Sequence, residues 1–187
     1  LAVTILGGLA LLIADASLSP ALLAGGILSL AALGLYGADV LYLYRARTRR
    51  IIELNSEMTA FALVSFAAAA ILALALAGLQ RFSGQIGALT FLVLFGWLTG
   101  LGLAKLYKII AFLTWLECYG PVLGKTSTPR VQDLVAEGRA RGWFFLYYAA
   151  TWVATAALLA SFVLLFRLAA AAMMLATVAI IIQLIRT

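Results

Sequence analysis

Apolar residues fill most of the chain in long blocks, and short polar segments separate these blocks. A helix needs about 20 apolar residues to cross the roughly 30 Å hydrocarbon core of a bilayer. Long apolar runs without strand alternation favour helices, because a helix satisfies its own backbone hydrogen bonds in lipid. We therefore predict an all-α, polytopic membrane protein, a single domain over residues 1–187. About six transmembrane helices form one bundle, over residues 1–14, 21–44, 58–79, 86–104 (extending to 117), 143–166 and 168–185.

The polar segments indicate where the chain turns. Asp15 to Pro20 separates the first two spans, Arg45 to Arg50 follows the second, and Gln80 to Gln85 precedes the fourth. An unbroken helix over residues 143–185 would be about 64 Å long, twice the thickness of the hydrocarbon core. We place the turn between the last two spans at Arg167, the one charged residue in that stretch.

Composition supports the membrane class. Hydrophobic residues make up 66% of the 187 positions and charged residues 11%, against roughly 25% charged in an ordinary soluble domain. The sequence starts at Leu1 and its first apolar block is short, so we expect that an N-terminal piece is missing.

The distribution of Lys and Arg predicts the orientation, because cytoplasmic loops of membrane proteins are enriched in these residues. One side of the predicted bundle carries Arg45, Arg47, Arg49, Arg50, Lys105, Lys108, Lys125, Arg130, Arg139, Arg141 and Arg186. The other side carries Arg81 and Arg167. We predict that both termini are cytoplasmic and that the basic loops contact anionic lipids rather than nucleic acid. Abundant Ala, Leu, Gly and Arg favour the inner membrane of a bacterium.

The polar segment before the fifth span contains an amphipathic pattern. Thr128 and Pro129 suit the start of a helix, and Val131, Leu134 and Val135 share one face. We predict a short cytoplasmic surface helix over about residues 129–141. It either lies on the lipid surface or docks a partner protein.

Cofactor chemistry has few ligands to draw on. Histidine is absent and Cys118 is the single cysteine, so an intrachain disulfide cannot form. Haem, copper and zinc sites need clusters of histidine, cysteine or carboxylate. We therefore predict no cofactor, no metal site and no catalytic residue, and we favour a protein that is not an enzyme.

The end of the fourth span contains the most informative polar residues. Lys105, Lys108, Trp115 and Tyr119 fall on roughly one helix face, and Glu117 lies nearby. One interpretation is a helix end that emerges from the bilayer, since lysine and aromatic side chains favour the interface. The other is a contact site for a lipid or quinone headgroup.

Two further sets of residues are candidates. Asp15 and Asp39 are the acidic residues nearest to apolar spans, and intramembrane acidic residues often have functions. Gly96, Gly100 and Ala104 recur every four residues, a spacing that lets helices approach closely.

The segment from Phe95 to Trp115 (Phe-Gly-Trp-Leu-Thr-Gly-Leu-Gly-Leu-Ala-Lys-Leu-Tyr-Lys-Ile-Ile-Ala-Phe-Leu-Thr-Trp) resembles a helix of small bacterial membrane proteins related to haem-copper oxidase subunit I. The resemblance covers about 30 residues. The histidines of that family are missing, with Leu89 and Phe91 in their neighbourhood. The resemblance implies a relative without metal ligands, in an accessory role beside a respiratory or electron-transfer complex.

Two hypotheses for the function follow. The first is a non-catalytic membrane subunit or accessory protein that packs against other transmembrane chains. The second is a small transporter or channel that uses Asp15, Asp39 or Glu117.

Overall fold

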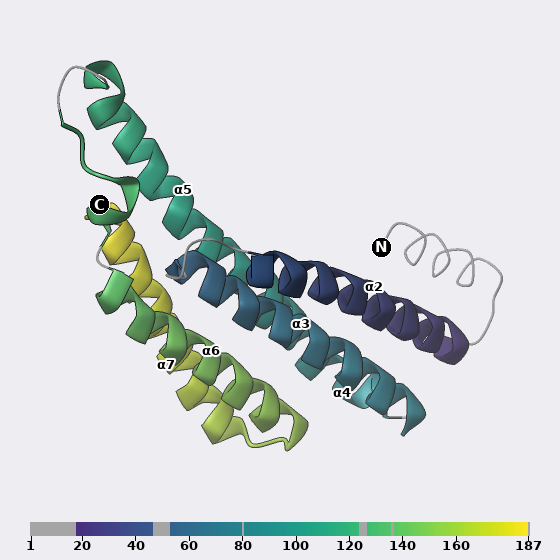
Figure 1. Ribbon diagram of the computed structural model, residues 1–187. Helices are drawn as coiled ribbons and strands as arrows, with labels where there is room; N and C mark the ends of the chain where they lie inside the picture. The colour runs from purple at the N-terminus through teal and green to yellow at the C-terminus, as the bar shows by residue number, and fades with distance from the viewer. Residues whose placement is uncertain (1–17, 47–52, 80, 124–126, 136, 187) are drawn as a thin grey trace.

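A computed structural model describes residues 18–46, 53–79, 81–123, 127–135 and 137–186 of the chain (Figure 1). These residues form helices and no β-strand, which confirms the all-α prediction. The α-helices are α2 (Leu18–Ala46), α3 (Leu54–Gly78), α4 (Phe82–Phe91), α5 (Gly100–Tyr119), α6 (Glu137–Leu159) and α7 (Val163–Ile185). Three further elements are the π-helix η1 (Leu92–Thr99) and the 3-10 helices η2 (Gly120–Val122) and η3 (Val131–Leu134).

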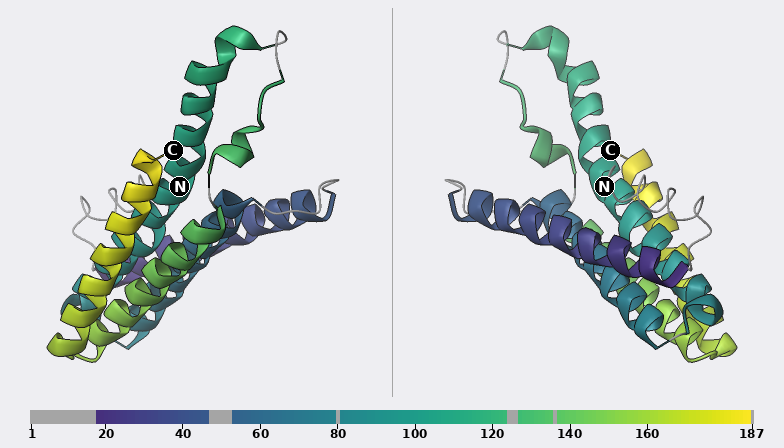
Figure 2. Two further views of the ribbon diagram at one scale, coloured as in Figure 1. Left: turned by 90° about the vertical axis from the view of Figure 1, so that its left-hand side faces the viewer. Right: turned by 90° about the vertical axis from the view of Figure 1, so that its right-hand side faces the viewer.

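Four helices in the described part of the chain are long and apolar enough to cross a membrane: Leu54–Gly78, Phe82–Val122, Gly138–Leu159 and Val163–Ile185. The chain thus has the character of a membrane protein, while the six-span topology stays a prediction. The predicted first span, residues 1–14, lies outside the described residues. The predicted second span forms α2, which contacts α3 at an inclination and is exposed along much of its length (Figure 2).

One helix is far longer than a bilayer is thick. α4, η1, α5 and η2 follow one another without a break over 41 residues, Phe82–Val122, which corresponds to a helix of about 61 Å. The predicted extension past Ala104 is therefore present. Its start differs, because Phe82 to Gln85 belong to α4 and not to a turn. The C-terminal part of α5 extends beyond the ends of the neighbouring helices (Figures 1 and 2).

The turn between the last two helices is at Ala160 to Phe162, so the prediction of a turn at Arg167 is wrong. The amide of Ser161 donates to the Leu158 carbonyl (3.2 Å) and the amide of Phe162 to the Ala157 carbonyl (2.9 Å). These two bonds form a Schellman ending, with Ser161 at φ 57° in the left-handed position that glycine usually occupies. Arg167 lies in the second turn of α7 and is exposed, which a helix tolerates without turning.

The predicted surface helix over residues 129–141 is also not formed as one element. Val131–Leu134 is a 3-10 helix, and Glu137 to Arg141 begin α6, which continues through Gly142. The apolar residues of this segment pack within the protein and are not left to face a membrane surface, because η3 contacts α5 and Val135 packs against the buried core.

The core lies where α3 and α6 begin and α7 ends. Four helices contribute residues at spacings of three and four, so each presents one face to the others. The buried cluster consists of Leu54, Met58 and Ala62 of α3, Leu103, Ala104 and Tyr107 of α5, Ala140, Phe144, Tyr147 and Tyr148 of α6, and Ala176, Ile180 and Leu184 of α7.

Candidate functional site

Two adjacent tyrosines of α6 tie this helix to two neighbours. The Tyr147 hydroxyl donates to the Phe95 carbonyl in η1 (2.6 Å), and the Tyr148 hydroxyl donates to the Met58 carbonyl in α3 (2.9 Å). Consecutive residues point about 100° apart on a helix, so the pair can reach two different elements. The Phe95 carbonyl also accepts the Gly100 amide, the wide hydrogen bond typical of a π-helix. A carbonyl has two lone pairs, so one oxygen can hold both bonds.

Gly96 and Gly100 lie where the long helix is in close contact with side chains of α3 and α6. A Cβ atom added to Gly100 would be 2.7 Å from the Tyr148 hydroxyl oxygen, and one added to Gly96 would be 3.0 Å from the Ser65 Cβ. Ala104 is fully buried in the core cluster. The stripe chosen from the sequence therefore lies at contacts within this chain, with α3 and α6.

Buried hydroxyl groups of α3 and α6 are also occupied by hydrogen bonds. Ser65 donates to the Phe61 carbonyl (3.0 Å) and accepts the Trp152 indole N–H (3.0 Å). Thr151 and Thr155 bond to backbone carbonyls one turn earlier, at 2.8 and 2.9 Å. None of these contacts pairs a hydroxyl with a general base. The Trp152 bond to Ser65 joins α6 to α3, and the other three bonds lie within their own helices.

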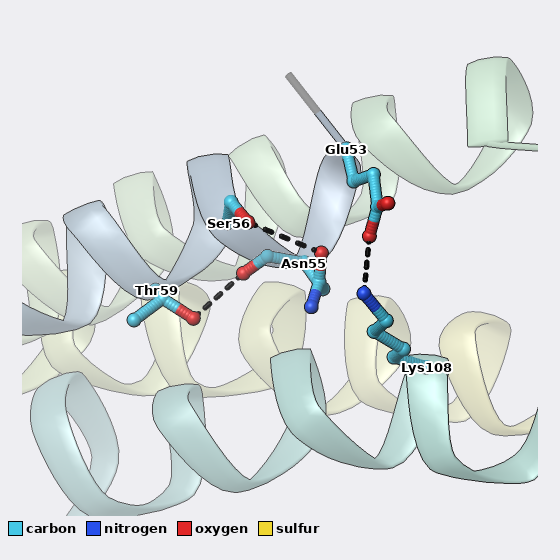
Figure 3. A network of polar contacts seen from close by, with 5 residues as sticks. All are labelled: Glu53, Asn55, Ser56, Thr59 and Lys108. Atoms are coloured by element: carbon cyan, nitrogen blue, oxygen red, sulfur yellow. Dashed lines mark hydrogen bonds and ion pairs between the residues drawn. The ribbon is translucent and has the colours of Figure 1, made fainter. Parts of the chain in front are cut away.

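Two ion pairs lie at the end of the bundle where α3 begins. Glu53 pairs with Lys108 of α5, and Glu57 pairs with Arg141 of α6 at 2.9 Å. Figure 3 shows the first pair beside Asn55, whose carbonyl accepts the Thr59 hydroxyl (2.6 Å). We call Glu53, Glu57, Lys108 and Arg141 the charge belt. Carboxylates in the first turn of α3 also complement the positive end of its dipole.

Past the charge belt, α5 is covered by its own chain on one side only. The Trp115 indole N–H donates to the Pro129 carbonyl (2.8 Å), and η3 contacts the same helix. The side of α5 away from the buried Tyr107 and Ala111 carries half-exposed apolar side chains: Ile109 (49%), Phe112 (48%), Leu113 (51%) and Leu116 (49%). We call these four residues the α5 stripe, and residues 109–122 the α5 overhang.

The residues predicted to contact a lipid or quinone headgroup lie in different environments in the structure. Lys108 is engaged by Glu53 and Trp115 by Pro129, so both have protein partners. Lys105 and Glu117 are exposed, and Tyr119 is half-buried at the end of α5. These residues therefore do not line one pocket. Lys108 belongs to the charge belt and Lys105 lies three residues before it on α5, whereas Glu117 and Tyr119 lie in the far half of the overhang.

The acidic candidates that the structure describes lie apart, Asp39 on α2 and Glu117 on α5. Asp39 is exposed on α2, and Asp15 lies outside the described residues. Within the described part of the chain, no group of three or more cysteine and carboxylate side chains could hold a metal ion.

Several residues of this arrangement are absent from the sequence prediction. Tyr147, Thr151 and Thr155 recur every four residues along α6 and form a polar stripe that could have been recognised in the sequence. Glu53 and Glu57 have the same spacing, and each has a basic partner on another helix. The π-helix has no comparable sequence signal.

Comparisons with protein-family models, curated proteins and solved structures found no match to this chain. The resemblance of the Phe95 to Trp115 segment, which forms parts of η1 and α5, to proteins related to haem-copper oxidase subunit I stays a prediction.

Proposed function

We propose that this protein is a non-catalytic subunit or accessory protein of a membrane complex, and that it holds another chain on the cytoplasmic side of a bacterial inner membrane. In this proposal six helices cross the membrane and both termini are cytoplasmic. The basic residues support this orientation. Arg45, Arg139, Arg141 and Arg186 lie at or near the helix ends that meet at the charge belt, and Lys105 and Lys108 lie on α5 at the belt itself, whereas Arg81 and Arg167 lie near the opposite ends of α4 and α7. The first group is the cytoplasmic side by the rule that Lys and Arg concentrate there.

The observation that carries the proposal is the α5 overhang. If the charge belt marks the membrane surface, residues 109–122 add about 21 Å of helix outside the hydrocarbon. Apolar side chains within the bilayer are covered by lipid, but the α5 stripe would be in contact with water. A contiguous apolar patch in contact with water is typical of an interaction site.

The transport hypothesis has less support. Asp39 and Glu117 are exposed and lie on different helices, α2 and α5. The buried polar side chains of the bundle include Ser65, Thr151 and Thr155, whose hydroxyls already bond to carbonyl groups of the helices. A proton or cation path would need ionisable groups at mid-depth.

Purification from the native membrane in mild detergent, followed by native mass spectrometry, tests the proposal. We expect at least one different chain in a defined ratio. Leu116→Ser should weaken this association, and Leu98→Ser serves as its matched control. Leu98 lies in the bundle part of the same long helix and has nearly the same exposure, 47% against 49%. A stable, solitary monomer would overturn the proposal.

A further inference from the structure

The α5 stripe has the spacing of a helix-binding surface. Ile109, Phe112, Leu113 and Leu116 occupy positions i, i+3, i+4 and i+7, which form one face over two turns. Such a face packs well against the apolar face of another helix. Tyr107 and Ala111 lie on the opposite face of α5 and are buried against the rest of the chain, so the stripe has a defined outward direction.

Lipid cannot cover the far end of the stripe under the proposed membrane position. Leu116 lies about 12 Å beyond Lys108 along the helix. The headgroup layer adds only about 5–8 Å on each side of the hydrocarbon core. A protein is therefore the occupant that fits the whole stripe.

The charges near the stripe favour a different protein over a second copy of this chain. Lys105 is exposed and lies one turn before Ile109, on the same face of α5. Copies inserted in the same orientation form dimers about an axis perpendicular to the membrane. Their α5 helices would then run parallel, and Lys105 would face Lys105. This like-charge contact is unfavourable, and the chain's net charge of +6 adds to the repulsion.

We propose that the α5 stripe binds an amphipathic helix of a different protein, in which acidic residues flank the apolar face and pair with Lys105. This inference rests on the proposed function and specifies its partner. The apolar residues of the partner cover Phe112 and Leu116. The basic side chains at this end of the bundle, including Arg139, attract its acidic flank during association.

Peptide binding tests the charge preference directly. The full chain is placed in nanodiscs of neutral phosphatidylcholine, and binding to empty nanodiscs is subtracted. The probe is a peptide of about 18 residues, five helical turns, with a leucine face and glutamate flanks; its control has lysine flanks. We expect the glutamate peptide to bind about tenfold more tightly at low salt, with a smaller difference at high salt.

Matched variants locate the binding surface. Leu116→Glu should abolish binding of the glutamate peptide, and Lys105→Glu should reverse the preference between the two peptides. Glu117→Gln changes a charge elsewhere on α5 and should retain the preference for glutamate. Equal binding of both peptides, or an unchanged preference in Lys105→Glu, would overturn the inference.

Photo-cross-linking distinguishes failure of this inference from failure of the proposed function. A benzophenone amino acid at position 116, in the full chain in native membranes, should give an adduct with an acidic amphipathic segment of another protein. An adduct with a second copy, or with lipid alone while a partner still co-purifies, overturns the inference and leaves the proposed function standing. If no chain co-purifies and only lipid is labelled, both are wrong.

Discussion

The long helix Phe82–Val122 has two parts, the bundle part (residues 82–108) and the α5 overhang (residues 109–122). Both are rich in apolar residues, but their surroundings differ. In the bundle part, Gly96 and Gly100 contact Ser65 of α3 and Tyr148 of α6. In the overhang, η3 and the Pro129 carbonyl cover one side, and the α5 stripe stays exposed. Apolar residues are about half exposed in both parts, Leu98 at 47% and Leu116 at 49%, but under the proposed membrane position lipid covers the first and water surrounds the second. The comparison supports the proposal that the α5 stripe binds another molecule, since each of its four residues is about half exposed.

The bundle part depends on small residues and backbone acceptors. Lipid is as apolar as leucine, so helices in a membrane associate through close packing and a few hydrogen bonds. The missing side chain of Gly100 leaves room for Tyr148, which reaches the Met58 carbonyl. In the overhang, one such bond joins Trp115 to the Pro129 carbonyl, and the four residues of the α5 stripe are about half exposed. Substitutions in the two parts should therefore have different effects on folding.

The largest effect is expected for Gly100→Ala. The added methyl would be 2.7 Å from the Tyr148 hydroxyl oxygen, and this buried, hydrogen-bonded ring has little freedom to move. We expect the free energy of unfolding to fall by about 2 kcal/mol, as for other overpacked cores. Unfolding in mixed detergent micelles measures this change. Gly102→Ala is the control, because nothing lies within 4 Å of its new Cβ. Equal effects of the two variants would contradict close packing at Gly100.

A smaller effect is expected for Tyr148→Phe, which keeps the ring and removes the hydroxyl. The hydrogen bond to the Met58 carbonyl is buried, so its loss should lower the free energy of unfolding by about 1 kcal/mol. The same unfolding assay applies. The stacking of this ring on Phe61, with centroids 5.5 Å apart, should persist. An unchanged stability would show that the bond does not join α6 to α3.

The smallest effect on folding is expected for Leu116→Ser in the overhang. Half of the Leu116 side chain is exposed, so the isolated protein should lose less than about 0.5 kcal/mol of unfolding free energy, as surface substitutions usually do. Binding of the glutamate peptide should nevertheless weaken. A large loss of stability would mean that the stripe packs within the protein and would remove the contrast between the two parts of the helix.

Part of the fold could be predicted because the bilayer restricts the choices. Long apolar blocks in this chain can only be helices, and the polar segment near Arg81 separates two of them in the structure. The turn between α6 and α7 could not be located in this way. Its residues, Ala160 to Phe162, contain no glycine or proline, and Ser161 takes the left-handed conformation instead. Arg167 is the more conspicuous signal, but a charge in the second turn of a helix can simply stay exposed.

Some features of the candidate site could likewise be predicted from the sequence, and others could not. The spacing of Gly96 and Gly100 is visible in the sequence, but the neighbours of these glycines are not. The acceptors of Tyr147 and Tyr148 are backbone carbonyls more than 50 residues away, which no side-chain pattern records. The ion pairs of Glu53 and Glu57 likewise depend on which helices become adjacent.

The amino-acid sequence is enough to establish the helical membrane class, the polar breaks between most helices and the scarcity of metal-binding side chains. These follow from local composition, because each helix satisfies its own backbone wherever it lies. The point where the long helix leaves the bundle, the carbonyls that the tyrosines reach and the apolar residues that stay uncovered become visible in the folded structure alone. These properties depend on contacts between distant segments, and each contact is set by the packing of all the helices together.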